Sequence, residues 1–108
     1  MAKKLERARV HIHATFNNTI ITLTDLDGAV LAWQSPGCVG FKGSRKGTPY
    51  AAQVAADRLI GKMREFGIRS VIITINGAWP CRHSVTQTLK GAGIRIEEIK
   101  NVTPVSHS

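Results

Sequence analysis

An alternation of apolar and polar residues opens the ordered part of the chain. Between Arg9 and Phe16 the even positions are apolar and the odd positions are polar, which predicts a strand with one buried face. Asn17-Asn18 tolerates a left-handed backbone and residues 19–24 are rich in β-branched side chains, so the two segments predict a hairpin. After a turn at residues 25–28, the apolar run at residues 29–34 predicts a third strand covered on both faces, with Trp33 in the core.

The second half of the chain changes to a helical period. Apolar residues at spacings of four and three predict a long helix from Pro49 to Phe66, with Gly67 as its stop. Residues 70–76 are almost entirely β-branched and predict a buried central strand reached through a helical crossover. A shorter helix at about residues 82–89, ended by Gly91 or Gly93, and a last strand at residues 94–99 complete the order β-β-β-α-β-α-β. This order predicts a single α/β domain with one mixed sheet and two crossover helices.

The charge of the chain narrows the class of partner. Fifteen Lys and Arg against seven Asp and Glu give a net charge of +8, which favours an extended polyanion. No apolar run approaches the ~20 residues of a membrane-spanning helix, so nucleic acid is preferred to a membrane. Cys38 and Cys81 form no Cys-x-x-Cys pair, and two unpaired thiols are favoured over a disulfide, which stays open.

A glycine-rich basic segment joins the third strand to the long helix. Residues 37–50 hold four of the ten glycines and three cations, Lys42, Arg45 and Lys46. Glycine lets backbone N–H groups approach an anion closely. Thr48 and Pro49 suit the start of a helix, whose N-terminus also attracts anions. No lysine precedes Thr48, so this is not a nucleotide P-loop, and the glycine spacing does not match the dinucleotide fingerprint. The segment predicts a phosphate contact, and an ordinary solvated connection is the alternative.

The predicted strand order is also that of ribonuclease-H-like nucleases, which hold two metal ions with three or four carboxylates at strand ends. The first strand carries no acid, and the acids in the middle of the chain fall in a turn or a helix. Apart from Glu6 in the N-terminal arm, only Glu97 and Glu98 remain. The sequence therefore predicts a ribonuclease-H-like scaffold with no catalysis, metal or cofactor, and a nuclease dependent on Glu97 and Glu98 is the alternative.

Two further groups of residues could support chemistry. His11 and His13 share one strand face, but no third metal ligand is evident, so paired surface histidines near RNA are favoured. Cys81 stands beside Arg82 and His83, which could activate its thiol, yet neighbours in sequence do not supply a positioned base. We therefore expect no nucleophilic site.

Three separated motifs resemble one known family. They are His11-Ile12-His13-Ala14-Thr15-Phe16-Asn17-Asn18-Thr19, the residues from Gly40 to Gln53, and Asn101-Val102-Thr103-Pro104. Together they resemble the small ribosomal subunit protein eleven family over about residues 10–107. The resemblance implies a non-catalytic ribonuclease-H-like fold on the platform of the small subunit. There it would bind folded ribosomal RNA near the mRNA exit path and touch neighbouring ribosomal proteins, without a membrane and without forming a homo-oligomer.

The resemblance and the charge pattern together predict where RNA is contacted. They divide the chain into a basic arm at residues 1–9, an RNA-binding α/β domain at residues 10–100 and a C-terminal tail at residues 101–108. A plain β-turn role for Asn17 and Asn18 is an equal alternative to RNA contact. The expected RNA-binding residues are Lys3, Lys4, Arg7, Arg9, Asn17, Asn18, Thr19, Lys42, Gly43, Ser44, Arg45, Lys46, Thr48, Arg82, His83, Asn101, Thr103 and His107.

The sequence departs from the family pattern at two places. The family usually has Gly-Pro-Gly-Pro-Gly-Arg before its second helix, whereas residues 77–82 read Gly-Ala-Trp-Pro-Cys-Arg. Trp79 and Cys81 thus replace glycines or small residues, and Trp79 could stack on a base or pack against a protein. The family's tail usually continues through Asn-Gly-Cys-Arg-Pro-Pro into a basic cluster, whereas the sequence here stops at Ser108. This divergence favours a mitochondrial ribosome, with a chloroplast or the bacterial cytoplasm as the alternative.

Overall fold

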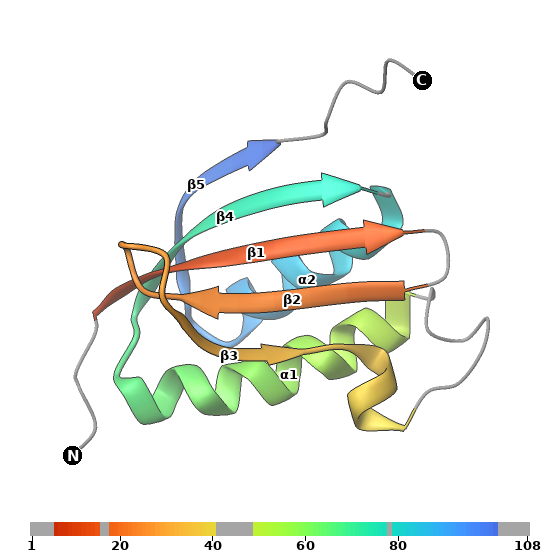
Figure 1. Cartoon of the computed structure of the whole chain (residues 1–108), viewed down its shortest axis with the longest axis horizontal. Coiled ribbons are helices and arrows are strands. Elements are labelled where there is room, and N and C mark those ends of the chain that lie inside the picture. Colours follow the sequence, from red (N-terminus) through yellow and green to blue (C-terminus); the bar gives the residue numbers. More distant parts are fainter. Residues whose placement is uncertain (1–5, 16–17, 41–48, 78, 102–108) are drawn as a thin grey trace.

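A computed structural model describes residues 6–15, 18–40, 49–77 and 79–101 of the chain. It has one five-stranded mixed sheet of order β3-β2-β1-β4-β5 (Figure 1). Strands β1, β2 and β3 pair antiparallel, and β4 runs parallel to both β1 and β5. The predicted α/β fold and element order are confirmed. The elements are β1 (Arg7–Thr15), β2 (Asn18–Thr24), β3 (Val30–Gln34), the 3-10 helix η1 (Pro36–Val39), α1 (Pro49–Phe66), β4 (Ser70–Gly77), α2 (Trp79–Gly91) and β5 (Arg95–Asn101).

Both helices cover the same face of the sheet and pack against each other. Helix α1 lies against β2 and β3, and α2 lies against β1 and β5 (Figure 1). Alternate residues of the strands point to this face, as the period-2 pattern of β1 predicts. The core between sheet and helices is built from Val10, Ile12, Ile21, Leu23, Val71, Ile73, Ile75, Ala52, Ala56, Leu59, Met63, Val85 and Leu89. Within the described residues, the other face of the sheet carries no helix.

The two helices end in the same way, which fixes where the next strands begin. Gly67 has a φ of 77° and donates its N–H to Arg64 O at 3.2 Å, and Ile68 donates to Met63 O at 3.0 Å. This is a Schellman motif with glycine at C′. The prediction that Gly67 ends the helix is therefore confirmed.

After α2 the motif recurs. Gly93, with a φ of 84°, donates to Lys90 O at 3.1 Å, and Ile94 donates to Leu89 O at 3.1 Å. Of the two glycines expected to end this helix, Gly93 holds the left-handed position. Each glycine is followed by a buried isoleucine, so the turn that ends the helix also anchors the approach to the next strand.

The prediction that the third strand is covered on both faces is wrong. Strand β3 lies at the edge of the sheet, and helices cover only one of its faces. Trp33 is 54% exposed and Val30 is 62% exposed, so Trp33 is not a core residue. An unbroken apolar run is typical of two-sided burial, but an edge strand of a two-layer fold has cover on one side only.

Smaller differences concern element boundaries. Strand β1 begins at Arg7, so Arg7 and Arg9 belong to the sheet and not to an N-terminal arm. Residues 36–39 form a 3-10 helix inside the segment expected to be a loop, and α2 begins at Trp79, before the expected start at about residue 82. Strand β5 extends to Asn101, the first residue assigned to the tail. Among the described helices none is long and apolar enough to cross a bilayer.

Candidate nucleic-acid interface

One end of the sheet collects segments that are far apart in sequence. A row of paired residues crosses all five strands near this end, running through Asn101, Ile75, Ile12, Ile21 and Gln34. Beyond the row each strand starts or stops within a few residues, and both α1 and α2 begin here (Figure 1). We call this region the helix-start end. It comprises the end of β1 and the start of β2, Gly40 and Pro49 at either side of the basic segment, the start of α2 and the last residue of β5.

The backbone makes the helix-start end electropositive. The first turns of α1 and α2 contain no acidic residue, whereas Arg64 and Lys90 lie in their last turns. Each helix N-terminus carries roughly half a positive charge and several N–H groups without intrahelical partners. Two such termini at one end, with no carboxylate in either first turn, can bind anionic oxygens.

The described residues expected to contact RNA fall largely at this end. Asn18 begins β2, Arg82 and His83 lie in the first turns of α2, and Asn101 ends β5. His83 is exposed, and its ring lies 3.4 Å from the amide nitrogen of Gln87. The fold thus brings together three stretches that are well separated in sequence.

Many of the expected contacts lie outside the described residues. The segment between Gly40 and Pro49 is attached at both its ends to the helix-start end. The remaining expected residues outside the described ranges belong to the arm, the hairpin tip and the tail. Together these positions are Lys3, Lys4, Asn17, Lys42, Gly43, Ser44, Arg45, Lys46, Thr48, Thr103 and His107.

Thr19 does not fit the expected role of an RNA contact. Its side chain is fully buried, although it stands one residue into β2 at the helix-start end. A buried hydroxyl has no surface toward an external ligand, so Thr19 belongs to the interior of the fold. Only its neighbour Asn18 remains as a described hairpin candidate.

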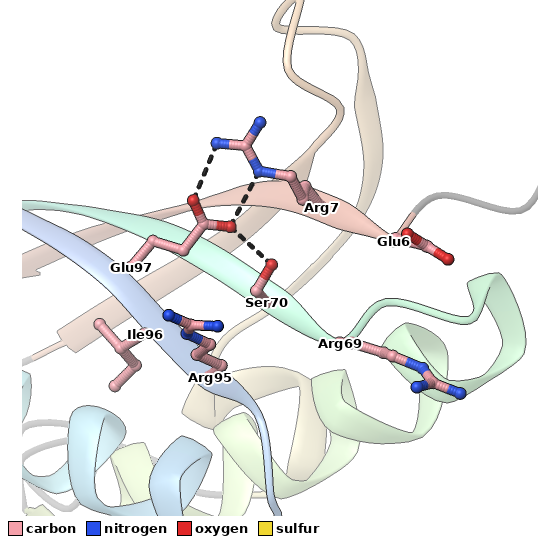
Figure 2. A pocket seen from close by; sticks show the side chains of 7 residues that line it. All are labelled: Glu6, Arg7, Arg69, Ser70, Arg95, Ile96 and Glu97. Atoms are coloured by element: carbon pink, nitrogen blue, oxygen red, sulfur yellow. Dashed lines mark hydrogen bonds and ion pairs between the residues drawn. The ribbon is translucent and has the colours of Figure 1, made fainter.

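The opposite end of the sheet holds an ion pair that the sequence did not predict. Arg7 at the start of β1 donates from Nε to Glu97 Oε2 at 2.9 Å and from Nη2 to Oε1 at 2.8 Å (Figure 2). Ser70 at the start of β4 donates its hydroxyl to the same Oε2 at 2.6 Å. These two donors, Arg7 first, lower the pKa of Glu97 to about 2. A bidentate guanidinium–carboxylate contact is among the stronger side-chain pairings.

This ion pair changes the expected role of the basic residues near the N-terminus. Arg7 is committed to Glu97, and Arg9 donates from Nε to Leu26 O at 3.2 Å. Both arginines therefore have partners within the chain. Strand β1 of nine residues spans ~26 Å, so these arginines lie well away from the helix-start end.

The end of the sheet that holds Arg7 and Glu97 forms an open pocket of mixed charge. Its lining comprises Glu6, Arg7, Arg69, Ser70, Arg95, Ile96 and Glu97. Figure 2 shows Arg69 and Glu6 directed away from the Glu97 carboxylate, with Arg95 nearer to it. The positive charge of Arg95 is a lesser cause of the lowered Glu97 pKa. The pocket is thus organised around a carboxylate already satisfied by Arg7 and Ser70.

The described carboxylates do not resemble a two-metal site. Both oxygens of Glu97 accept hydrogen bonds from protein donors, and Glu98 lies 3.9 Å from the Lys100 ammonium. Within residues 6–15, 18–40, 49–77 and 79–101 no three His, Cys, Asp or Glu side chains gather where they could hold a metal.

The paired histidines have unequal surroundings. His11 is half-buried and His13 is exposed. Burial, and then the charge of Arg9, lower the pKa of His11 below its ordinary value. Cys38 is exposed and its thiol is free.

Sequence reasoning missed the contacts that join the strand starts. Arg7 and Glu97 are 90 residues apart, and no short motif links them. Their pairing follows from sheet topology, because β4 lies between β1 and β5 and its first residue, Ser70, bridges the gap. The exposure of Trp33 was missed for a related reason, since it depends on β3 being an edge strand.

Comparison with known protein sequences identifies a family. The family model for ribosomal protein S11 matches residues 8–108. The small ribosomal subunit protein uS11 of Thermotoga maritima is 55% identical over 96 residues, an alignment that covers 89% of this chain and 74% of that protein. This relative is bacterial, so it gives no support to a mitochondrial placement and fits the bacterial alternative. The chain belongs to the ribosomal protein S11 family and is a structural, non-enzymatic component of the small ribosomal subunit.

Proposed function

We propose that the chain binds folded ribosomal RNA of the small subunit through its helix-start end. One observation carries the proposal: two helix N-termini without acidic first turns begin where both ends of a cationic glycine-rich segment are attached. Backbone dipoles and the side chains of Lys42, Arg45 and Lys46 then act on the same phosphates.

The chemistry of this end suits RNA shape more than RNA sequence. Cations and backbone N–H groups bind phosphate oxygens, and the amides of Asn18 and Asn101 can hydrogen-bond ribose and phosphate. These contacts fix the orientation of the protein on a folded RNA. Such a role matches the position that the family resemblance implies, on the platform near the mRNA exit path, as a single copy among neighbouring proteins and away from membranes.

The N-terminal lysines form a second, smaller contact in this proposal. Lys3 and Lys4 precede β1, whose first residue lies at the end opposite the helix starts. Arg7 and Arg9 are left out of the interface because their guanidinium groups have partners within the chain. The RNA is therefore contacted at two separated places.

The salt dependence of binding tests the proposal. A triple variant, Lys42→Ala with Arg45→Ala and Lys46→Ala, should bind a platform fragment of small-subunit ribosomal RNA more weakly. The slope of log affinity against log salt should fall by about 2 to 3, because each lost phosphate contact removes roughly 0.7 to 0.9. Filter binding between 50 and 500 mM salt, with about five contacts expected in the parent chain, measures this slope.

A charge-matched control separates local contact from net charge. Lys62→Ala with Arg64→Ala and Lys90→Ala also removes three cations, but from the C-terminal parts of α1 and α2, away from the helix starts. This control should leave the slope nearly unchanged. Equal slopes for the two triple variants would remove the basic segment from the RNA interface.

A further inference from the structure

The two edges of the sheet differ in how they are protected. Strands β3 and β5 end the strand order, so each has backbone N–H and C=O groups without a strand partner among the described residues. Strand β5 carries Arg95, Glu97, Glu98 and Lys100. It also has a register shift, because Val71 pairs with Ile96 and Ile72 pairs with Glu98. Charges and bulges are devices that prevent a sheet edge from pairing with another chain.

Strand β3 lacks the charge protection. Neither β3 nor its neighbour β2 contains a charged residue, in a chain where 20% of residues are charged. The exposed apolar side chains of Val30 and Trp33 lie on β3, and Ile20 of β2 is 38% exposed. Trp33 pairs with Thr22, which in turn pairs with the half-buried His11, so Trp33 lies on the helix-free face of the sheet.

The chemistry of this edge fits a polypeptide better than RNA. An RNA contact would need cations against phosphate, and β2 and β3 supply none. Unpaired backbone donors and acceptors in a row match an extended peptide, which adds itself as a further strand. Depletion of charge and exposure of tryptophan are also the marks of the centre of a protein interface.

The geometry limits how long the added strand can be. Leu31 has no opposing residue on β2, because Leu23 pairs with Ala32 and the next residue, Thr24, pairs with Val30. Regular pairing covers Ala32 to Gln34, so few backbone hydrogen bonds are available to a partner. Side-chain contact with Trp33 must therefore supply much of the binding.

We propose that the outer edge of β3 receives an extended, uncharged segment of a neighbouring small-subunit protein, paired as a sixth strand and packed against Trp33. This inference rests on the proposed function only in that the chain must be assembled into the subunit. It assigns RNA to the helix-start end and protein to the β3 edge.

Site-specific cross-linking in assembled small subunits tests the inference. Full-length chains carry the photo-reactive residue p-benzoylphenylalanine either at position 33 or, as a control, at position 99. Ile99 is 48% exposed on β5, the protected edge. Position 33 should cross-link to one segment of another protein, and position 99 should not cross-link to that segment. Amide hydrogen exchange at residues 32–34 should slow at least about tenfold on assembly, as for a newly paired strand.

A charged variant adds a quantitative measure. Trp33→Lys places a cation on an exposed position and should leave the core intact, which the unfolding temperature checks. In competition with the parent chain for subunit assembly it should be disfavoured by at least about tenfold, the effect of losing an interface hot spot. Ile99→Lys should compete nearly equally.

Each other outcome has a defined meaning. A cross-link from position 33 to ribosomal RNA, or no cross-link in assembled subunits, would overturn the inference while leaving the proposed function intact. A protein cross-link without slowed exchange at residues 32–34 would overturn strand addition. Failure of the parent chain to enter small subunits would overturn the proposed function, and the inference with it.

Discussion

At the scale of single residues, the Arg7–Glu97 contact is the most informative feature of the described structure. It joins the first and last strands across β4, with Ser70 as a third participant. Both charged side chains reach solvent, so the pair contributes little to stability on its own. The contact is informative because it occupies the guanidinium of Arg7, which was expected to bind RNA.

The first residue-scale prediction concerns pH. The pKa of Glu97, about 2, lies below its ordinary value of 4.5, so folding favours the charged carboxylate. The resulting stability is fully present above about pH 4.5 and is lost as pH falls toward 2. The difference in unfolding temperature between the parent chain and Glu97→Gln should therefore be small but positive at pH 6 and vanish near pH 2. Glu98→Gln serves as the control. A difference that stays constant from pH 6 to pH 2 would contradict the ion pair.

At the scale of elements, the sequence predicted α1 best. Its bounds from Pro49 to Phe66 were predicted because proline at the first turn and glycine after the last residue are local signals. Strand β3 shows the limit of the same method. Its five residues were found, but their burial depends on which strands become neighbours, and no property of the segment itself encodes that.

The element-scale prediction compares two glycines at the end of α2. Gly93→Ala should destabilise the protein by about 1 to 2 kcal/mol, because alanine at a φ of 84° is strained while no neighbouring atom blocks its Cβ. Gly91→Ala lies within the helix, also in open space, and should be neutral or stabilising by up to about 1 kcal/mol. Urea unfolding measures both changes. Equal effects would show that Gly93 does not cap the helix.

At the scale of the whole molecule, the candidate interface was predicted in part. Cations and glycines nominated residues 42–48 from local composition, and the fold brings Asn18, His83 and Asn101 to the same end as the attachment points of that segment. The role of Thr19 was not predictable, because burial of a hairpin residue depends on helices that come later in the chain. The predicted N-terminal arm also included too many residues. Arg7 belongs to β1 and pairs with Glu97, a residue near the other end of the chain.

A whole-molecule prediction follows from the distance between the two proposed RNA contacts. Lys3→Ala with Lys4→Ala should lower the salt slope of RNA binding by about 1 to 2. Combined with the triple variant of residues 42, 45 and 46, the two losses should add, because the two segments join the fold near opposite ends of the sheet and distant sites are usually independent. Filter binding of all three proteins to the same RNA fragment measures the sum. An unchanged slope for the double variant would confine RNA to the helix-start end.

The Arg7–Glu97 contact also has a consequence for biosynthesis. The chain is made from its N-terminus, so Arg7 leaves the peptidyl-transferase centre 90 positions before its acceptor exists. All residues of the β1–β2 hairpin are synthesised early. The Arg7–Glu97 contact across β4 can form only after nearly the whole polypeptide has been made. A nascent copy stalled before residue 97 would therefore expose an uncommitted guanidinium beside Lys3 and Lys4. Only a copy extended past residue 97 can pair it with Glu97.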